Sequence, residues 1–232
     1  MSRVAAALVL LAAFLPILTA AQEATSAAPP TEKARFFFGF TACRTSPGGE
    51  LDGKLVLGDP VYAYFLPRLD PSAGFSVQGG AALKSGIWSA GYFQSSHNAY
   101  FQGWERSATL HAVEIEGKGY LIRARPVRPF LLAGFSIPWL TVKDGSLKGD
   151  AVYDAHYIGL GVKVGAGLAA QIVPRVILTA GLHYRYLALL YVKGGGKARD
   201  VANLYVDRFG PKRRGFIKVP STGWEIGLVF TL

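Results

Sequence analysis

Side chains of two kinds alternate strictly along the last ten residues of the chain, 223–232. The apolar set is Trp224, Ile226, Leu228, Phe230 and Leu232, and the other set is Glu225, Gly227, Val229 and Thr231. Because successive side chains of a β-strand point to opposite faces, this pattern predicts a strand with one apolar face. An apolar face opposite a face that carries a charge is typical of a barrel wall in lipid, with the charge inward.

Two longer segments, 155–172 and 175–191, show the same alternation most clearly. Aliphatic residues share one face of the first segment, and its other face is mostly glycine with Lys163 and Gln171. In the second segment His183 and Arg185 lie opposite a face of leucine and tyrosine. A soluble sheet gives no reason for a face of small residues with isolated charges. A narrow barrel lumen does, because glycine there makes room for long polar side chains.

Eight segments are predicted as strands, which makes the chain all-β. They are 35–43, 74–83, 86–95, 107–122, 128–142, 155–172, 175–191 and 223–232. The connections at 84–85, 124–127 and 173–174 are short, and those at 44–73, 96–106, 143–154 and 192–222 are longer. Short periplasmic turns alternate in this way with long extracellular loops in bacterial barrels. We therefore predict an eight-stranded antiparallel transmembrane β-barrel with both ends of the barrel domain on the periplasmic side.

The segment 54–66 leaves a second strand count open. It is apolar enough for two more strands around Gly58, which would make ten. Asp59, Pro60 and Pro67 are poor residues for the interior of a sheet. We therefore interpret the segment as a folded extracellular loop and keep ten strands as the alternative.

The first 34 residues are predicted to precede the barrel. Arg3 is followed by an apolar run at 4–18 and small residues at 19–21, the pattern of an export signal. The run is short for an anchor helix, which needs about 20 residues. We predict a signal peptide at 1–21, a disordered lead-in at 22–34 and an outer-membrane barrel domain at 35–232. The expected location is the outer membrane of a Gram-negative-type bacterium.

Positive charge is concentrated in the last predicted loop. The chain carries +10, or +9 without Arg3, and the segment 192–222 alone carries +6. Its basic residues are Lys193, Lys197, Arg199, Arg208, Lys212, Arg213, Arg214 and Lys218. Lysine and arginine bind phosphate, and lipopolysaccharide phosphates lie at the height of extracellular loops. The hypothesis is that this loop binds lipopolysaccharide or another anionic surface molecule; the alternative is a flexible solvated loop.

Seven ionisable residues fall on the inward faces of four predicted strands. They are Glu114, Glu116, Lys118, Lys163, His183, Arg185 and Glu225. A basic side chain that faces lipid at mid-bilayer costs about 2–4 kcal/mol, so these residues are expected to point inward. We interpret them as an ion-pair network that fills the lumen. The alternative is a polar path for small solutes.

In layout the chain resembles the eight-stranded outer-membrane barrels of the OmpA, OmpX and OmpW type. The segments RPFLLAGF at 128–135 and GLGVKVGAGL at 159–168 are part of this resemblance. The last strand is similar to the C-terminal barrel-assembly signal, through Glu225, Gly227, Phe230 and Leu232, although Leu232 stands where an aromatic residue is usual. The resemblance implies a small closed barrel, contact with outer-membrane lipid and the barrel-assembly machinery, and no particular activity.

A hydrolytic site is the remaining alternative. Ser95, Ser96 and His97 end the third predicted strand, and His111 and Glu105 belong to the next hairpin arm. A hydroxyl, an imidazole and a carboxylate near one rim make a nucleophile, a base and an orienter for lipid modification. Ser96 and His97 are adjacent, however, and adjacent side chains on a strand diverge. Solvated rim positions are therefore the preferred interpretation.

No sequence motif indicates a cofactor, and the single Cys43 cannot form an internal disulfide or a cysteine metal site. Export makes nucleic acid a poor partner for the basic surface. We expect a monomeric barrel without enzymatic activity, with a structural or surface-interaction role. A narrow channel for small solutes and an outer-membrane lipid-modifying hydrolase are the two functional alternatives.

Overall fold

The computed structural model describes residues 34–122, 126–206, 210–213 and 215–232. The predicted signal peptide at 1–21 and the lead-in up to residue 33 lie outside this part of the chain. Eight long strands make the wall: β1 Arg35–Pro47, β5 Ser72–Leu83, β6 Gly86–Phe101, β7 Trp104–Tyr120, β8 Val127–Lys148, β9 Ala151–Val173, β10 Val176–Lys193 and β13 Ile217–Thr231. The described residues include one short 3-10 helix, η1 Val201–Asn203, and no helix long and apolar enough to cross a membrane.

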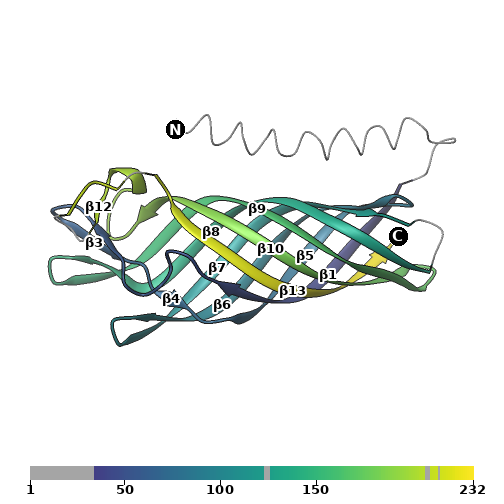
Figure 1. Ribbon diagram of the computed structural model, residues 1–232, viewed down its shortest axis with the longest axis horizontal. Coiled ribbons are helices and arrows are strands. Elements are labelled where there is room, and N and C mark those ends of the chain that lie inside the picture. Colours follow the sequence, from purple (N-terminus) through teal and green to yellow (C-terminus); the bar gives the residue numbers. More distant parts are fainter. Residues whose placement is uncertain (1–33, 123–125, 207–209, 214) are drawn as a thin grey trace. The chain divides into compact units, whose positions relative to one another are not determined.

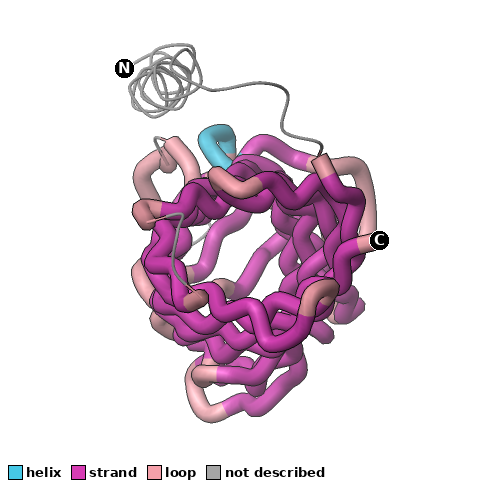
Figure 2. Tube along the Cα trace, turned by 90° about the vertical axis from the view of Figure 1, so that its right-hand side faces the viewer, coloured by secondary structure: helices cyan, strands magenta, loops and turns pink. Residues whose placement is uncertain are grey.

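The eight long strands close into a ring (Figures 1 and 2). Each pairs antiparallel with its neighbours in chain order, and β13 pairs with β1 to close the circle. The predicted eight-stranded antiparallel barrel is therefore confirmed. The segment 54–66 contributes only the short strands β2 Val56–Gly58 and β3 Tyr62–Phe65, which are not members of the closed ring, so the ten-strand alternative is wrong.

The two ends of the barrel differ in their connections. At the turn end, strands join through residues 84–85, 121–126 and 174–175, and β13 finishes there beside the start of β1. The loop end carries the connections 48–71, 102–103, 149–150 and 194–216. The predicted loops at 96–106 and 143–154 are thus largely strand. The strands were predicted from their outward apolar residues. Beyond the apolar belt the outward positions are polar, such as Ser96 and Asn98, so the ends of these strands were predicted as loops.

Apolar side chains cover the outside of the wall. Leu182 is 71% exposed, and Phe36 is 74% exposed. Large apolar residues also project outward from the other wall strands, among them Phe38, Phe40, Trp88, Ile115, Leu131, Phe135, Ile158, Leu168, Trp224, Ile226 and Leu228. In water such a surface is unfavourable, and in hydrocarbon it is the expected one.

The interior is stacked in three layers, all of which can be followed along β7. From the loop end, its inward residues are Ala108, Leu110 and Ala112, then Glu114, Glu116 and Lys118, then Tyr120. The first group belongs to a large apolar cluster at the loop end, and Tyr120 belongs to a second apolar cluster at the turn end. The charged group between them lies in what we call the ion layer. The expectation of a lumen filled by small or ionic groups therefore holds only for the middle of the barrel.

The connections 48–71 and 194–216 fold over the loop end, and we call their described residues the cap. Within it, β2 pairs with β3 and with β12 Tyr205–Val206, and β3 pairs with the end of β8. Two further short strands, β4 Arg68–Leu69 and β11 Arg199–Asp200, pair with β6 and β10. Leu51, Leu66 and Leu204 of the cap are buried in the loop-end apolar cluster. The cap thus covers the loop-end opening of the barrel with apolar side chains.

Candidate functional site

Two lysines and two glutamates form the centre of the ion layer. Lys163 Nζ lies 2.7 Å from Glu225 Oε2 and 3.0 Å from Glu116 Oε2. Lys118 Nζ lies 2.7 Å from Glu225 Oε1 and 3.5 Å from Glu116 Oε1. All four side chains are less than a tenth exposed. Each lysine is therefore shared between two carboxylates, which come from β7 and β13.

Arg185 and Glu114 make a second pair in the same layer. Arg185 Nη2 donates to Glu114 Oε1 at 2.6 Å, and the guanidinium carbon lies 4.2 Å from the centroid of the Phe93 ring. His183 Nδ1 lies 3.6 Å from Glu225 Oε2. The structure thus brings together all seven residues that the sequence placed in the lumen. Three basic side chains, excluding His183, face three acidic ones, so this layer is balanced in charge.

Glycine leaves the space that the ion layer occupies. A Cβ added to Gly223 would lie 2.7 Å from His183 Nε2. At Gly227 it would lie 2.7 Å from Thr41 Oγ1 and 2.8 Å from Thr179 Oγ1. These distances are too short for carbon, so the His183 ring and the two threonines occupy space that a side chain at either glycine would need.

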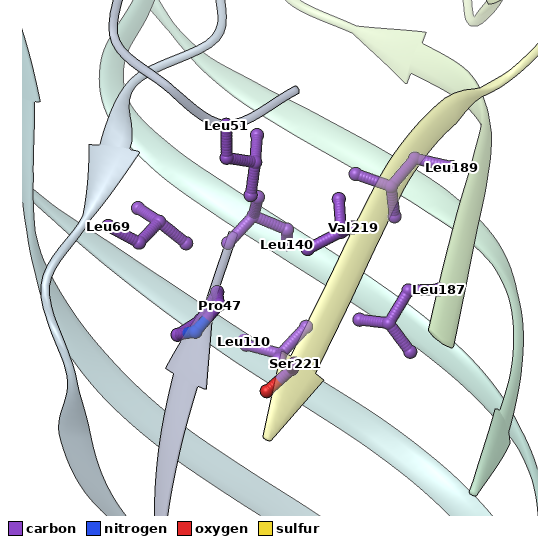
Figure 3. A pocket seen from close by; sticks show the side chains of 9 residues that line it. All are labelled: Pro47, Leu51, Leu69, Leu110, Leu140, Leu187, Leu189, Val219 and Ser221. Carbon is purple, nitrogen blue, oxygen red and sulfur yellow. The ribbon is translucent and has the colours of Figure 1, made fainter. Parts of the chain in front are cut away.

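A small apolar cavity of about 10 Å³ lies at the loop end, where the wall meets the cap (Figure 3). Its lining comes from five wall strands and the cap: Pro47, Leu51, Leu69, Leu110, Leu140, Leu187, Leu189, Val219 and Ser221. This cavity was not predicted, because apolar residues were expected only on the outward face of each strand. The signal was present in the stretch LALLYV at 187–192, where both faces of one strand are apolar.

The basic residues of the last loop separate into two groups. Arg199 is ion-paired with Asp59 and stacks 4.5 Å from the Tyr62 ring. Arg213 Nη2 donates to both carboxylate oxygens of Glu50 at 2.7 Å. These two arginines hold the two halves of the cap together. Their side chains are therefore engaged with carboxylates, and the expectation that they bind anions freely is wrong.

The exposed basic residues of that loop are lysines: Lys193, Lys197, Lys212 and Lys218. Arg208 and Arg214 lie outside the described residues. Lys193 ends β10 and Lys218 lies on the adjacent strand β13. Two cations on neighbouring strands at the loop end are therefore open to solvent, five residues apart in the register, because Lys218 is the partner of Ala188.

A serine and a histidine form a buried hydrogen-bonded pair on β6. His97 Nε2 lies 2.8 Å from Ser95 Oγ, and His97 Nδ1 lies 2.8 Å from the carbonyl oxygen of Asp70. Ser95 is 2% exposed and His97 is 3% exposed. His97 does not pair with its neighbour Ser96, which points outward, but with Ser95, because residues two apart on a strand share a face.

The other residues considered for hydrolysis lie elsewhere. His111 is on the outer face, where its ring stacks on Trp139 at 5.3 Å and Nδ1 contacts the Tyr92 hydroxyl. Glu105 is exposed at the hairpin tip and accepts a hydrogen bond from Tyr100. The structure therefore does not bring Glu105 or His111 to the Ser95–His97 pair.

The residues of the proposed assembly signal divide between the two faces of β13. Glu225 belongs to the ion layer and Gly227 faces the lumen. Phe230 stacks on Phe38 of β1 at 5.1 Å, and Leu232 is 76% exposed. Glu225, Gly227 and Phe230 thus lie on the strand that closes the ring against β1, and Leu232 directly follows its last residue.

No protein-family model matches the sequence, and no curated protein matches it. Among solved structures, Neisserial surface protein A is 17% identical, with 87% of this chain and 100% of that chain covered and a TM-score of 0.53. A major outer membrane protein from Thermus thermophilus is 11% identical, with coverage of 85% and 99% and a TM-score of 0.48. The first similarity supports the fold and the second is too low to add to it. The chain therefore has the fold of the small eight-stranded outer-membrane β-barrel proteins.

Proposed function

We propose that the protein is a closed outer-membrane barrel with a structural or surface-interaction role. The supporting observation is its inverted polarity, with large apolar side chains outside the wall and a balanced ion layer inside it. A charged interior and an apolar exterior favour hydrocarbon as the surrounding medium. The resemblance of the barrel to Neisserial surface protein A supports the same environment.

Membrane fractionation with gel migration tests this proposal. We expect the protein in the outer-membrane fraction, and we expect unboiled samples to migrate differently from boiled ones because the closed wall resists detergent. Recovery from the soluble periplasmic fraction, with migration unaffected by boiling, would contradict it. A known soluble periplasmic protein, followed through the same fractionation, is the control.

At the loop end we propose that Lys193 and Lys218 bind phosphate groups of lipopolysaccharide. Both are exposed on neighbouring strands, above the apolar belt of the wall. An ammonium group near an anionic membrane surface contributes about 1 kcal/mol. Arg199 and Arg213 take no part, because Asp59 and Glu50 hold them within the cap.

A double substitution measures this binding. Lys193→Gln with Lys218→Gln should weaken binding of the purified protein to lipopolysaccharide by roughly 2 kcal/mol, or about 30-fold. The loss should shrink at high salt, since exposed charges are screened. Lys84→Gln, at the opposite end of the barrel, removes the same charge per site and should leave the Kd unchanged. Equal affinities of the double variant and wild type would reject the lysine site.

A further inference from the structure

We propose that Ser95 and His97 are the nucleophile and general base of an acyl-ester hydrolase site inside the loop end of the barrel. This goes beyond the proposed structural role, and it does not depend on lipopolysaccharide binding. Three observations carry it: the hydrogen bond between the two side chains, the carbonyl that orients the imidazole, and a small apolar cavity lined by Leu110, the register partner of Ser95.

The Asp70 carbonyl fixes the tautomer that a base needs. A carbonyl oxygen only accepts hydrogen bonds, so His97 Nδ1, 2.8 Å away, must carry the proton. In the neutral ring, Nε2 is then the acceptor, and the Ser95 hydroxyl at 2.8 Å donates to it. An oriented imidazole that accepts the proton of a serine hydroxyl is the arrangement that activates serine as a nucleophile.

The position of Asp70 is itself held by backbone pairing. Asp70 N donates to the Asn98 carbonyl at 3.0 Å, and Leu69 pairs with Ala99 of β6. The orienting carbonyl therefore belongs to the part of the cap that is attached to β6. It can stay in place when the rest of the cap moves.

Two neighbours connect the pair to the apolar cavity. Leu110 lies directly opposite Ser95 in the β6–β7 register, and it lines the cavity. Leu69, the residue before Asp70, lines it as well, as Figure 3 shows. In the closed structure this cavity has room for only about one water molecule, so an ester whose carbonyl lay at Ser95 would place its acyl chain among these leucines only after the cap lifts. This environment selects esters of apolar carboxylic acids over charged or sugar-like acyl groups.

The cap controls access to this site. Leu51 belongs to the cap and lines the same cavity as the wall leucines Leu140 and Leu187, which are far from it in sequence. The serine and histidine are almost fully buried in the closed state. Substrate entry thus requires the Leu51 segment to lift, and a smaller residue at position 51 should ease it.

The reaction balances with water as the only co-substrate. Ser95 Oγ bonds to the acyl carbon as its proton passes to His97 Nε2, and the tetrahedral species then expels the alcohol, which takes that proton. Water attacks the acyl-serine ester in the same way, with Nε2 again receiving and returning one proton. The products are the alcohol and the carboxylic acid, and Ser95 recovers its hydroxyl.

An alkyl fluorophosphonate and a series of 4-nitrophenyl esters from four to twelve acyl carbons test the proposal on the full-length protein in detergent. We expect a phosphonyl adduct at Ser95 by mass spectrometry, and ester hydrolysis that falls as the solution is acidified and the imidazole becomes protonated. Leu51→Ala should accelerate both. Ser95→Ala and His97→Ala should each reduce hydrolysis by about 100-fold or more.

Ser96→Ala is the matched control, because its side chain points outward from the same strand. Its hydrolysis rate should equal that of wild type, and heat-modifiable migration verifies that every variant is folded. If folded wild type and folded Leu51→Ala both remain unlabelled and inactive, the proposal is wrong, and the hydrogen bonds of His97 serve only to hold the cap. Labelling of a residue other than Ser95 would also overturn it.

Discussion

At the residue scale, the centre of the ion layer depends on two carboxylates, Glu116 and Glu225, that each contact two lysines. Glu225 lies 2.7 Å from both Lys118 and Lys163, so one glutamate compensates two buried ammonium groups. Charges in a low-dielectric interior are costly unless they are paired and hydrogen-bonded. The shared geometry also fixes the relative register of β7, β9 and β13, because the three strands supply the interacting atoms.

Glu225→Gln should therefore destabilise the barrel by about 3 kcal/mol, since it leaves two buried lysines with only Glu116 between them. Reversible urea unfolding in lipid vesicles measures this loss. Adding Lys118→Met should recover part of it, because the surplus charge is removed. Glu105→Gln, at an exposed tip, should stay within about 0.5 kcal/mol of wild type. If the double variant proves no more stable than Glu225→Gln, the charge argument fails.

At the element scale, the cap is held by side-chain ties between loops that are distant in sequence. Glu50 accepts from Arg213 and from the backbone N–H of Lys218, and Asp59 is ion-paired with Arg199. Tyr157 of β9 donates to the Phe65 carbonyl at 2.7 Å, which attaches the cap to the wall. Burial raises the pKa of Tyr64 to about 12, so its phenol stays neutral inside the cap.

Arg213→Gln should loosen the cap and leave the wall intact. A hydrogen bond to a charged group contributes about 1.5–3 kcal/mol when buried, and Glu50 is partly exposed, so we expect tryptic cleavage at Lys54 or Lys197 to be about 10-fold faster. Limited proteolysis with mass spectrometry locates the cuts. Lys212→Gln, exposed and adjacent, is the control. Unchanged cleavage, or a barrel that loses heat-modifiable migration, would contradict this role of Arg213.

At the scale of the whole molecule, two apolar layers enclose the ion layer. Leucines of the cap and wall lie on its loop side, and Phe37, Ile87, Tyr120, Phe130 and Val229 are among the buried residues on its turn side. An ion that crossed the barrel would have to shed water in both layers. The arrangement therefore argues against the narrow channel as the resting state.

Planar-bilayer recording of the purified protein should accordingly show no steady conductance at moderate voltage. An ion would have to lose its water in each of the two apolar layers, and the ion layer between them is already filled by side chains. A large porin recorded in the same bilayer shows that insertion and detection work. Regular unitary steps from the wild-type barrel would establish an open path and refute the closed interior.

Much of the fold could be predicted from the two-residue alternation of apolar and other side chains along the sequence. All eight wall strands were predicted, because a wall strand in lipid must alternate, and residues such as Glu114, Lys163 and Glu225 could then be assigned to one side. The ends of β6 and β8 were predicted too short, since their outward positions become polar beyond the apolar belt. The same alternation rule predicts that Ser95 and His97 share one face of the strand, because they are two residues apart.

By itself, then, the sequence determined the strand order, the inward or outward side of most wall residues and the balance of charge inside. Those properties depend on local alternation, which each strand carries alone. The tertiary structure decided which charges meet, that Arg199 and Arg213 are engaged within the cap, and that leucines of distant strands enclose a small cavity lined by Leu110, the register partner of Ser95. Such contacts depend on the register of the ring and on loop packing, because neither is encoded within any single segment.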